Sequence, residues 1–353
     1  MVKLIKHIAL AFTTLVILFS AGLSYAGHAE ILIDAESGLI IHEEDANHSW
    51  YPASLTKVMT LYMAFTALNQ GQIGLQDRMP VSHHAAKQPT SKLGLRTGES
   101  ITVEEAILAI ITRSANDATV VLAEYIGGNE ENFAARMTAK AHALGMYDSH
   151  FMNATGLPHQ WQVTTARDLG LLAWRIRRDF PNFYAYFAAH SFYFKGRELT
   201  GINKFTATFP GAEGMKTGFT CGSGYNLMSS AQQNGKRLIG VVLGGISSSQ
   251  RYQLMTDMMN RGFQNLFTGY GTKNITTIPG KFVGSAPYQL GCGKGAPNSQ
   301  QATVSPTKHH SYHRLTQSKT SAKHFVSRAK PSKTTKTKVV SRQKASKTRY
   351  HRG

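Results

Sequence analysis

The segment Pro52-Ala53-Ser54-Leu55-Thr56-Lys57-Val58-Met59-Thr60 decides how the rest of this 353-residue chain is interpreted. It opens an apolar stretch that predicts a helix from about Ser54 to Asn69, stopped by Gly71. Ser54 and Lys57 are three residues apart, so a helix places the hydroxyl and the amine on one face. A serine alcohol becomes a nucleophile when a base takes its proton, and a lysine can do so only when neutral. Burial or a second nearby cation lowers the pKa of an amine far enough.

The Ser-x-x-Lys spacing is weak evidence by itself, because short motifs often match by chance. It occurs three more times in this chain, at Ser305–Lys308, Ser327–Lys330 and Ser341–Lys344. All three repeats lie in a segment whose composition predicts no folded structure. The choice of Ser54 therefore depends on what else the chain places around it.

A second motif, Ser114-Ala115-Asn116, falls between two predicted helices. The first helix opens at Thr102 with a capping box completed by Glu105, and the second runs from about Asp117 to Ile126. Side chains in such a break can point into a cleft. A hydroxyl there could relay a proton to a leaving amine, and the amide could hold a substrate backbone. The alternative is an ordinary helix cap, because serine and asparagine both favour cap positions.

A third motif, Lys216-Thr217-Gly218, precedes a predicted β-hairpin. The hairpin strands, Tyr225 to Gln232 and Arg237 to Leu243, flank the turn signal Asn234-Gly235. We expect the motif to lie on a strand beside the cleft. A lysine there could attract a substrate carboxylate, and a glycine would let the substrate approach the backbone closely. The alternative is a surface lysine that enters a turn.

The order of the predicted elements indicates an α+β fold. Two short strands, Glu30 to Asp34 and Leu39 to His42, come first, and the hairpin brings strands back after a helical middle. That middle includes further helices expected from Asn129 to Gly145 and from Thr165 to just before Pro181. We therefore expect an antiparallel sheet with helices on its faces, in which the terminal strands pair with each other.

Taken together and in this order, the three motifs form a set shared by penicillin-binding proteins and serine β-lactamases. From roughly Glu30 to Phe267 the sequence resembles the D-alanyl-D-alanine carboxypeptidases, which are low-molecular-mass penicillin-binding proteins. Besides the segment around Ser54, the matching stretches are Ser114–Ala118, Asn153–Pro158, Thr164–Leu169, Lys216–Thr220 and Gly224–Leu227. The resemblance implies the β-lactamase and DD-peptidase fold, an antiparallel sheet flanked by helices with a helical subdomain.

The resemblance also implies a reaction. Ser54 would be acylated by the penultimate D-alanine of a peptidoglycan stem peptide, with Lys57 as the general base. Ser114 would pass the proton to the departing D-alanine. Water would then hydrolyse the acyl-enzyme, and penicillins and other β-lactams would trap the enzyme because they acylate the same serine. No cofactor and no metal ion are expected in this chemistry.

Substrate-binding roles follow from the same resemblance. The residues expected to contact the substrate are Asn116, Lys216, Thr217, Gly218, Phe219 and Arg251. Asn116 would orient the peptide, while Lys216 and Thr217 would bind its terminal carboxylate. The N–H groups of Ser54 and Phe219 would form the oxyanion hole. Arg251 matches an arginine that the family places near the carboxylate, with a charge on a helix surface as the alternative.

The two ends of the chain have different compositions from its middle. Residues 1–26 combine Lys3 and Lys6 with an apolar stretch and end at Ala26, which predicts a cleaved signal peptide, with an uncleaved membrane anchor as the alternative. We expect the catalytic domain at 27–267, a linker at 268–294 and a disordered basic tail at 295–353. The protein is thus expected in the periplasm, at the outer face of the membrane or in the cell wall.

The net charge of +19 belongs to the tail and not to the folded body. All 20 acidic residues lie at or before Asp257, whereas 18 of the 39 lysines and arginines follow it. The tail could bind anionic cell-surface polymers or could be a solvated extension, and we expect no specific nucleic-acid partner. Family members often continue with an all-β domain and an amphipathic anchor helix, and we identify neither after Phe267.

Several other interpretations remain open at this stage. The same scaffold could carry a DD-endopeptidase or a β-lactamase, or a binding protein that works through its tail. His83-His84 and His309-His310 resemble metal-binding tracts but lack a third ligand at a convincing spacing. Export would permit a disulfide bond between Cys221 and Cys292, and the sequence leaves their pairing open.

Overall fold

The computed structural model describes residues 27–268, 271, 273–277 and 286. The predicted signal peptide, most of the predicted linker and the basic tail lie outside the described residues, as do His309-His310 and Cys292. Among the residues that are described, no helix has both the length and the apolar character needed to cross a bilayer.

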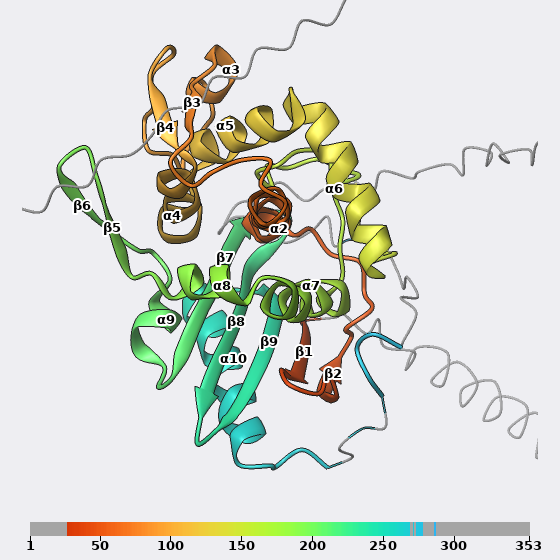
Figure 1. Ribbon diagram of the computed structural model, residues 1–353. Coiled ribbons are helices and arrows are strands. Elements are labelled where there is room, and N and C mark those ends of the chain that lie inside the picture. Colours follow the sequence, from red (N-terminus) through yellow and green to blue (C-terminus); the bar gives the residue numbers. More distant parts are fainter. Residues whose placement is uncertain (1–26, 269–270, 272, 278–285, 287–353) are drawn as a thin grey trace, which may run out of the picture. The chain divides into compact units, whose positions relative to one another are not determined.

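A five-stranded antiparallel sheet forms the centre of the fold, with the strand order β2-β1-β9-β8-β7 (Figure 1). Its strands are β1 (Ala29–Asp34), β2 (Ile40–Glu44), β7 (Ala212–Thr220), β8 (Gly224–Gln233) and β9 (Lys236–Gly245). β1 pairs with β9 from Ala29 opposite Leu243 to Asp34 opposite Leu238. The expected pairing of the terminal strands is therefore confirmed.

The β8–β9 turn explains why this hairpin could be predicted. Asn234 and Gly235 both have positive φ angles, 49° and 79°. Two consecutive residues of this kind form the turn whose twist matches that of paired strands, and asparagine followed by glycine tolerates it best. Gln233 lies opposite Lys236 across the turn, which sets the register of the whole hairpin.

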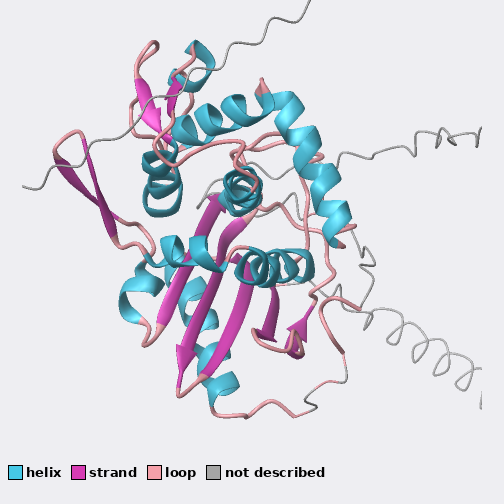
Figure 2. Ribbon diagram, viewed as in Figure 1, coloured by secondary structure: helices cyan, strands magenta, loops and turns pink. Residues whose placement is uncertain are grey.

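Helices cover both faces of the sheet (Figure 2). Helix α10 (Ser248–Phe263) packs against β8 and β9, and α7 (Ala166–Asp179) packs against β9 and β1. Because side chains alternate along a strand, β9 supplies Val242 to the core under α10 and Val241 to the core under α7. The α+β fold predicted from the element order is thus confirmed.

A helical region adjoins the α7 face. It contains α2 (Thr56–Asn69), α4 (Val103–Arg113), α5 (Asn116–Gly127) and α6 (Glu130–Leu144). The predicted capping box is present, because Thr102 accepts from the Glu105 backbone and the Glu105 side chain accepts from the Thr102 backbone. α2 is buried on nearly all sides, since α5, α6 and α7 all pack around it. The nucleophile segment therefore sits at the start of a central helix.

Several short elements had no counterpart in the prediction. They are β3 (Arg78–Pro80), α3 (His83–Ala86), β4 (Ser100–Thr102), α8 (Pro181–Tyr184), the 3₁₀ turn Ala185–Ala188, β5 (Ser191–Phe194), β6 (Arg197–Thr200) and α9 (Lys204–Thr208). Most are three to five residues long, too short for a periodic pattern. In the β5–β6 turn Lys195 and Gly196 both have positive φ angles. Lysine is an unusual residue in that conformation, so the sequence did not indicate the turn.

Candidate active site

Ser54 lies in a tight turn and not in the helix itself. A 3₁₀ turn spans Ala53–Leu55, and α2 begins at Thr56, two residues later than the predicted start. Ala53 has a φ of 48°, which is a left-handed conformation that alanine rarely adopts. Such strain persists only where the surroundings hold it, and it is common at functional sites.

Two glycines hold this nucleophile turn from opposite sides. A Cβ atom at Gly156 would lie 1.8 Å from the Ala53 carbonyl oxygen, and Gly156 also has a φ of 83°. A Cβ atom at Gly218 would lie 3.1 Å from the Ser54 backbone nitrogen. Gly156 therefore has to be glycine for its backbone to approach the turn, and Gly218 leaves room for a close contact with it. Gly156 comes from the loop before α7, and Gly218 comes from β7.

Asn226 on β8 fixes the residues just before the turn. Its Nδ2 donates to the carbonyl oxygens of Tyr51, at 3.0 Å, and Pro52, at 3.2 Å. Its Oδ1 accepts from the Gly244 backbone N–H at 3.0 Å, and the side chain is fully buried. Asn226 was not among the predicted site residues, because nothing in its local sequence distinguishes it from a strand asparagine.

Lys57 occupies the centre of the site. Its Nζ donates to Ser54 Oγ at 3.1 Å, to Asn116 Oδ1 at 2.7 Å and to the Thr155 carbonyl oxygen at 2.5 Å. The side chain is fully buried. The expected meeting of the Ser54 hydroxyl with the Lys57 amine is therefore present, and the amine has three oxygen partners without a carboxylate among them.

Burial lowers the pKa of Lys57 from 10.5 to about 7, because a charged ammonium loses its hydration inside the protein. The negative charge of Glu130 acts in the opposite direction and raises this pKa. A pKa near 7 means that a substantial fraction of the amine is neutral at neutral pH. Lys57 is thus able to accept a proton from its neighbour Ser54.

Ser114 and Asn116 lie at the break between α4 and α5, as predicted. Ser114 ends α4 with a φ of 55°, and Asn116 begins α5. Asn116 Nδ2 donates to the Pro89 carbonyl oxygen at 2.9 Å, which leaves Oδ1 directed at Lys57. The neighbouring Asp117 accepts from the backbone N–H groups of residues 93–95 and so fastens the loop that faces this break.

Lys216 extends from β7 into the same site. Its Nζ donates to Ser114 Oγ at 2.9 Å and to the Thr217 carbonyl oxygen at 2.8 Å. Only 1% of Lys216 is exposed. Burial, with the nearby charges of Lys57 and Arg251, holds its pKa well below the usual range for lysine. The structure thus joins the second and third motifs through a hydroxyl–amine pair.

Arg251 approaches this strand from the sheet's other face. It lies on α10, and its Nη1 donates to the carbonyl oxygens of Gly218, at 3.2 Å, and Asn226, at 3.3 Å. Only 8% of the residue is exposed, so the interpretation as a helix-surface charge is wrong. Phe219, the next residue of β7, is 46% exposed, and its ring stacks on Tyr225 at 4.2 Å.

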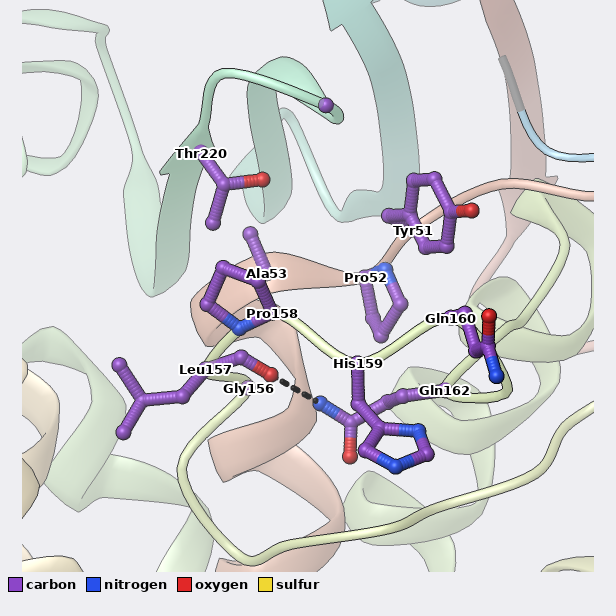
Figure 3. Close-up of a pocket in the computed structure, with 11 residues that line it drawn as sticks. Tyr51, Pro52, Ala53, Gly156, Leu157, Pro158, His159, Gln160, Gln162 and Thr220 are labelled. Atoms are coloured by element: carbon purple, nitrogen blue, oxygen red, sulfur yellow. Dashed lines mark hydrogen bonds between the residues drawn. The ribbon is translucent and has the colours of Figure 1, made fainter. Parts of the chain in front are cut away.

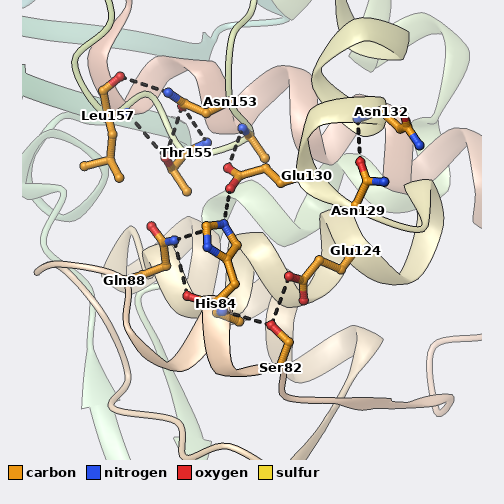
Figure 4. A network of polar contacts seen from close by, with 12 residues as sticks. Ser82, His84, Gln88, Glu124, Asn129, Glu130, Asn132, Asn153, Thr155 and Leu157 are labelled. Carbon is orange, nitrogen blue, oxygen red and sulfur yellow. Dashed lines mark hydrogen bonds and ion pairs between the residues drawn. The ribbon is translucent and has the colours of Figure 1, made fainter.

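Glu130 connects the site to the protein surface (Figure 4). Its Oε1 accepts from the Ala154 backbone N–H at 3.0 Å, and its Oε2 lies 2.7 Å from His84 Nε2. Ala154 precedes Thr155, whose carbonyl oxygen contacts Lys57. Glu130 therefore positions the loop that holds the Lys57 amine. Because His84 pairs with Glu130, the His83-His84 tract is a structural contact.

A pocket of about 210 Å³ lies beside the nucleophile turn (Figure 3). It is lined by Tyr51, Pro52, Ala53, Gly156, Leu157, Pro158, His159, Gln160, Gln162, Thr220 and Gly222. Thr220 lies two residues beyond Gly218 on β7, so the pocket is on the side of Ser54 away from Lys216. None of its lining residues is an acid, a lysine or an arginine.

The buried amide of Gln162 shapes this pocket. It donates to the Leu157 carbonyl oxygen at 3.2 Å and accepts from the backbone N–H groups of Met152 and Asn153. These bonds hold the 152–162 loop against the site. Nearby, Cys221 lies in the turn between β7 and β8 and carries no free thiol.

Comparisons with known proteins agree with this arrangement. A model of the D-alanyl-D-alanine carboxypeptidase family matches residues 20–247. D-alanyl-D-alanine carboxypeptidase DacC of Escherichia coli (strain K12) is 35% identical over 248 residues, which cover 68% of this chain and 62% of that protein. The chain spans somewhat less than two thirds of the length of the curated relatives that it matches most strongly.

Solved structures show the same likeness. Penicillin-binding protein 5 from Haemophilus influenzae superposes with a TM-score of 0.64 and 33% identity, over 67% of this chain and 70% of that one. Penicillin-binding protein D2 from Listeria monocytogenes, in its cefotaxime-bound form, gives a TM-score of 0.62 and 26% identity, over 67% of this chain and 96% of that one.

Proposed function

The chain belongs to the D-alanyl-D-alanine carboxypeptidase family, and on that premise we propose that it is a serine-type carboxypeptidase acting on peptidoglycan stem peptides. It removes the terminal D-alanine through an acyl-enzyme on Ser54. One observation carries the proposal, namely that a buried lysine with a pKa of about 7 lies 3.1 Å from the hydroxyl of a serine held in a strained turn. No metal or cofactor is needed for this chemistry.

The acylation step uses two hydroxyl–amine pairs, first Ser54 with Lys57 and then Ser114 with Lys216. Ser54 Oγ attacks the carbonyl carbon of the penultimate D-alanine, and its proton moves to neutral Lys57 Nζ. The backbone N–H groups of Ser54 and Phe219 stabilise the oxyanion. Ser114 Oγ passes a proton to the nitrogen of the terminal D-alanine as the peptide C–N bond breaks. The proton that Lys57 accepted replaces it on Ser114, so Lys57 is neutral again when D-alanine leaves. Water then hydrolyses the ester and restores the Ser54 hydroxyl.

The terminal carboxylate of the substrate binds beside Lys216 and Thr217. Three basic side chains, Lys57, Lys216 and Arg251, lie around this position, and among the described residues no acid forms a hydrogen bond with either lysine. A carboxylate is therefore the ligand that the local charge favours. Asn116 orients the peptide, while Gly218 and Phe219 present their backbone to it.

The upstream part of the stem peptide extends toward the pocket near Thr220. A peptide that runs along β7 from Lys216 past Gly218 reaches Thr220 next. The apolar wall formed by Tyr51, Leu157 and Pro158 suits the aliphatic part of a side chain. This supports a preference for substrates with a long side chain on the acyl side over substrates with glycine there.

The test is incubation of the full chain with a peptide that ends in D-Ala-D-Ala, comparing wild type with Ser54→Ala. We expect stoichiometric release of D-alanine by the wild type and a loss of at least about 10³-fold in the variant. A fluorescent penicillin should label the wild type covalently and leave Ser54→Ala unlabelled. Release that persists in Ser54→Ala would show that another group is the nucleophile.

The same experiment separates the alternatives. The cefotaxime-bound form of the Listeria relative supports a slowly hydrolysed β-lactam adduct here. Rapid turnover of penicillin would instead indicate a β-lactamase, and cleavage of cross-linked dimers in preference to free stems would indicate an endopeptidase. A chain that neither releases D-alanine nor binds penicillin would be a binding protein.

The cellular setting and the tail complete the proposal. We place the enzyme outside the cytoplasmic membrane, where its substrate is found, with residues 1–26 as the export signal. The basic tail at 295–353 binds anionic cell-surface polymers by charge. Sedimentation of the full chain with purified cell walls, compared with a chain lacking 295–353, tests this. Equal binding of the two proteins would exclude the tail as the tether.

A further inference from the structure

Two His-x-Glu triplets face each other at the opposite edge of the sheet. His28-Ala29-Glu30 includes the start of β1, and His42-Glu43-Glu44 ends β2. The antiparallel register places Glu30 directly opposite Glu44, and His42 opposite Leu32. Side chains two residues apart share a face of a strand, so both glutamates and both histidines lie on the same face.

Glu30 is the centre of this cluster. It is 8% exposed, and its two oxygens have different partners. Oε1 lies 2.8 Å from His42 Nε2, and Oε2 lies 3.5 Å from His28 Nε2. The His42 ring stacks on Phe267 with a centroid distance of 4.4 Å, which fixes its orientation. The Glu30 carboxylate is therefore held in place by packing as well as by hydrogen bonds.

The strand register brings two like charges together in this cluster, those of Glu30 and Glu44. Like charges directly opposite each other destabilise an antiparallel pair, and Glu30 and Glu44 are such a pair. Among the described residues, no lysine or arginine forms an ion pair with either glutamate, whereas Glu43 on the other face pairs with Lys273. A cation bound between Glu30 and Glu44 would offset their mutual repulsion.

We propose that His28, Glu30 and Glu44 bind a zinc ion, the β1–β2 zinc site. One potential ligand atom from each residue lies within 4.8 Å of the other two. Imidazole nitrogen and carboxylate oxygen are common zinc ligands at about 2.0–2.2 Å from the ion. His42 Nε2 forms a hydrogen bond with the other oxygen of Glu30, Oε1, and so orients this carboxylate without binding the metal. Water completes the coordination.

The zinc ion would fasten the edge strand β2 to β1. Strands β9 and β8 separate β1 from β7, so the ion takes no part in chemistry at Ser54. The spacing rules applied to the sequence missed this site, because its ligands come from two strands and meet only through the strand register. The inference does not depend on the proposed carboxypeptidase activity.

Isothermal titration of the full chain with zinc chloride at pH 7.5 tests the site. We expect a binding event that weakens at least 10-fold in both Glu30→Gln and His28→Gln. Cobalt(II) added to the wild type should give the visible absorption of a low-symmetry nitrogen and oxygen site, which both variants lose. His28 is partly exposed at the start of the described chain, so His28→Gln keeps the fold even if the buried Glu30→Gln does not.

The matched control is His309→Gln/His310→Gln, which removes the adjacent histidines of the tail. We expect this double variant to keep the zinc affinity and the cobalt spectrum of the wild type. Zinc binding that follows the tail histidines, that survives His28→Gln unchanged, or that is absent in the wild type at 100-fold excess of zinc would overturn the proposal.

Discussion

The two edges of the central sheet carry opposite buried charge. At the β7 edge, Lys57 and Lys216 are buried with hydroxyl, amide and carbonyl oxygens as partners. At the β2 edge, Glu30 is buried opposite Glu44 with imidazoles as partners. A fold that buries charge without a full counterion loses stability there. Such places indicate where a ligand of the opposite charge binds.

The two edges differ in how they reduce the loss of stability that a buried charge causes. At the β7 edge the ammonium groups lose a proton more easily, since burial lowers the pKa of Lys57 to about 7 and that of Lys216 well below its usual range. This change also creates a general base. At the β2 edge the carboxylate stays ionised between two histidines, with a pKa of about 2 for Glu30. One edge is suited to moving protons, the other to holding a cation.

The largest expected effect comes from Lys57→Met. Without the amine no group takes the Ser54 proton, and acylation by penicillin should slow by about 10²- to 10⁴-fold. The stability of the fold should not fall, because the variant removes a buried amine. Stopped-flow acylation and thermal unfolding measure the two effects. Lys204→Met, on the surface, serves as the control, and zinc binding at the other edge should be unchanged in both variants.

Lys216→Met should act mainly on recognition of the substrate carboxylate. Loss of one charge-assisted contact predicts a fall of about 10- to 100-fold in kcat/KM for D-alanine release. A peptide with an amidated C-terminus provides the matched test. The wild type should have a low kcat/KM for this amidated peptide, and Lys216→Met should lower that kcat/KM little further. An equal loss on both peptides would assign Lys216 to the chemistry of the reaction and not to the carboxylate.

Glu130→Gln should shift the pH dependence of acylation. The rate rises with pH as Lys57 loses its proton near pH 7, and the negative charge of Glu130 keeps that pKa higher than burial alone would. Removing the charge lowers the pKa further, so the rising limb should move toward lower pH, by up to about one unit. Rates measured from pH 5 to 9 test this. The exposed neighbour Glu131→Gln should leave the profile in place.

The smallest effect is expected from Glu44→Gln at the other edge. In metal-free buffer the variant removes the like charge opposite Glu30, and the free energy of unfolding should rise by about 0.2–1 kcal/mol. With zinc present the wild type should instead be more stable than Glu44→Gln, because the variant lacks one of the three side chains that bind the ion. Denaturant unfolding with chelator and with zinc measures both. If Glu44→Gln changed the free energy of unfolding equally with chelator and with zinc, the β2 edge would not bind a cation through Glu44.

The sequence was most informative where local chemistry determines structure. The Asn234-Gly235 turn, the capping box at Thr102 and the pairing of β1 with β9 were all predicted and confirmed. The motif order also predicted that the three motifs would lie together, and in the structure Lys57 contacts Ser54 and Asn116 while Lys216 contacts Ser114. Each of these features depends on short-range preferences or on a motif set with known order.

The features that the sequence did not predict depend on distant backbone contacts. Gly156 was part of a quoted segment, but its role requires the Ala53 carbonyl oxygen, roughly 100 residues away in sequence. Asn226 and Glu130 likewise act on loops that only the folded chain brings near them. The 3₁₀ turn at Ala53–Leu55 replaced the expected helix start because these contacts hold Ala53 in a left-handed conformation.

The pairing of β1 with β9 has a consequence for folding kinetics. β1, the first described strand, pairs with β9, which lies more than 200 residues further along the chain. Pairing over such a separation requires the closure of a long loop and slows folding. During synthesis the β1–β2 hairpin is complete long before β9 exists, with an unpaired edge that can bind other chains. Until the final hairpin has been made, this edge is open to association with other chains.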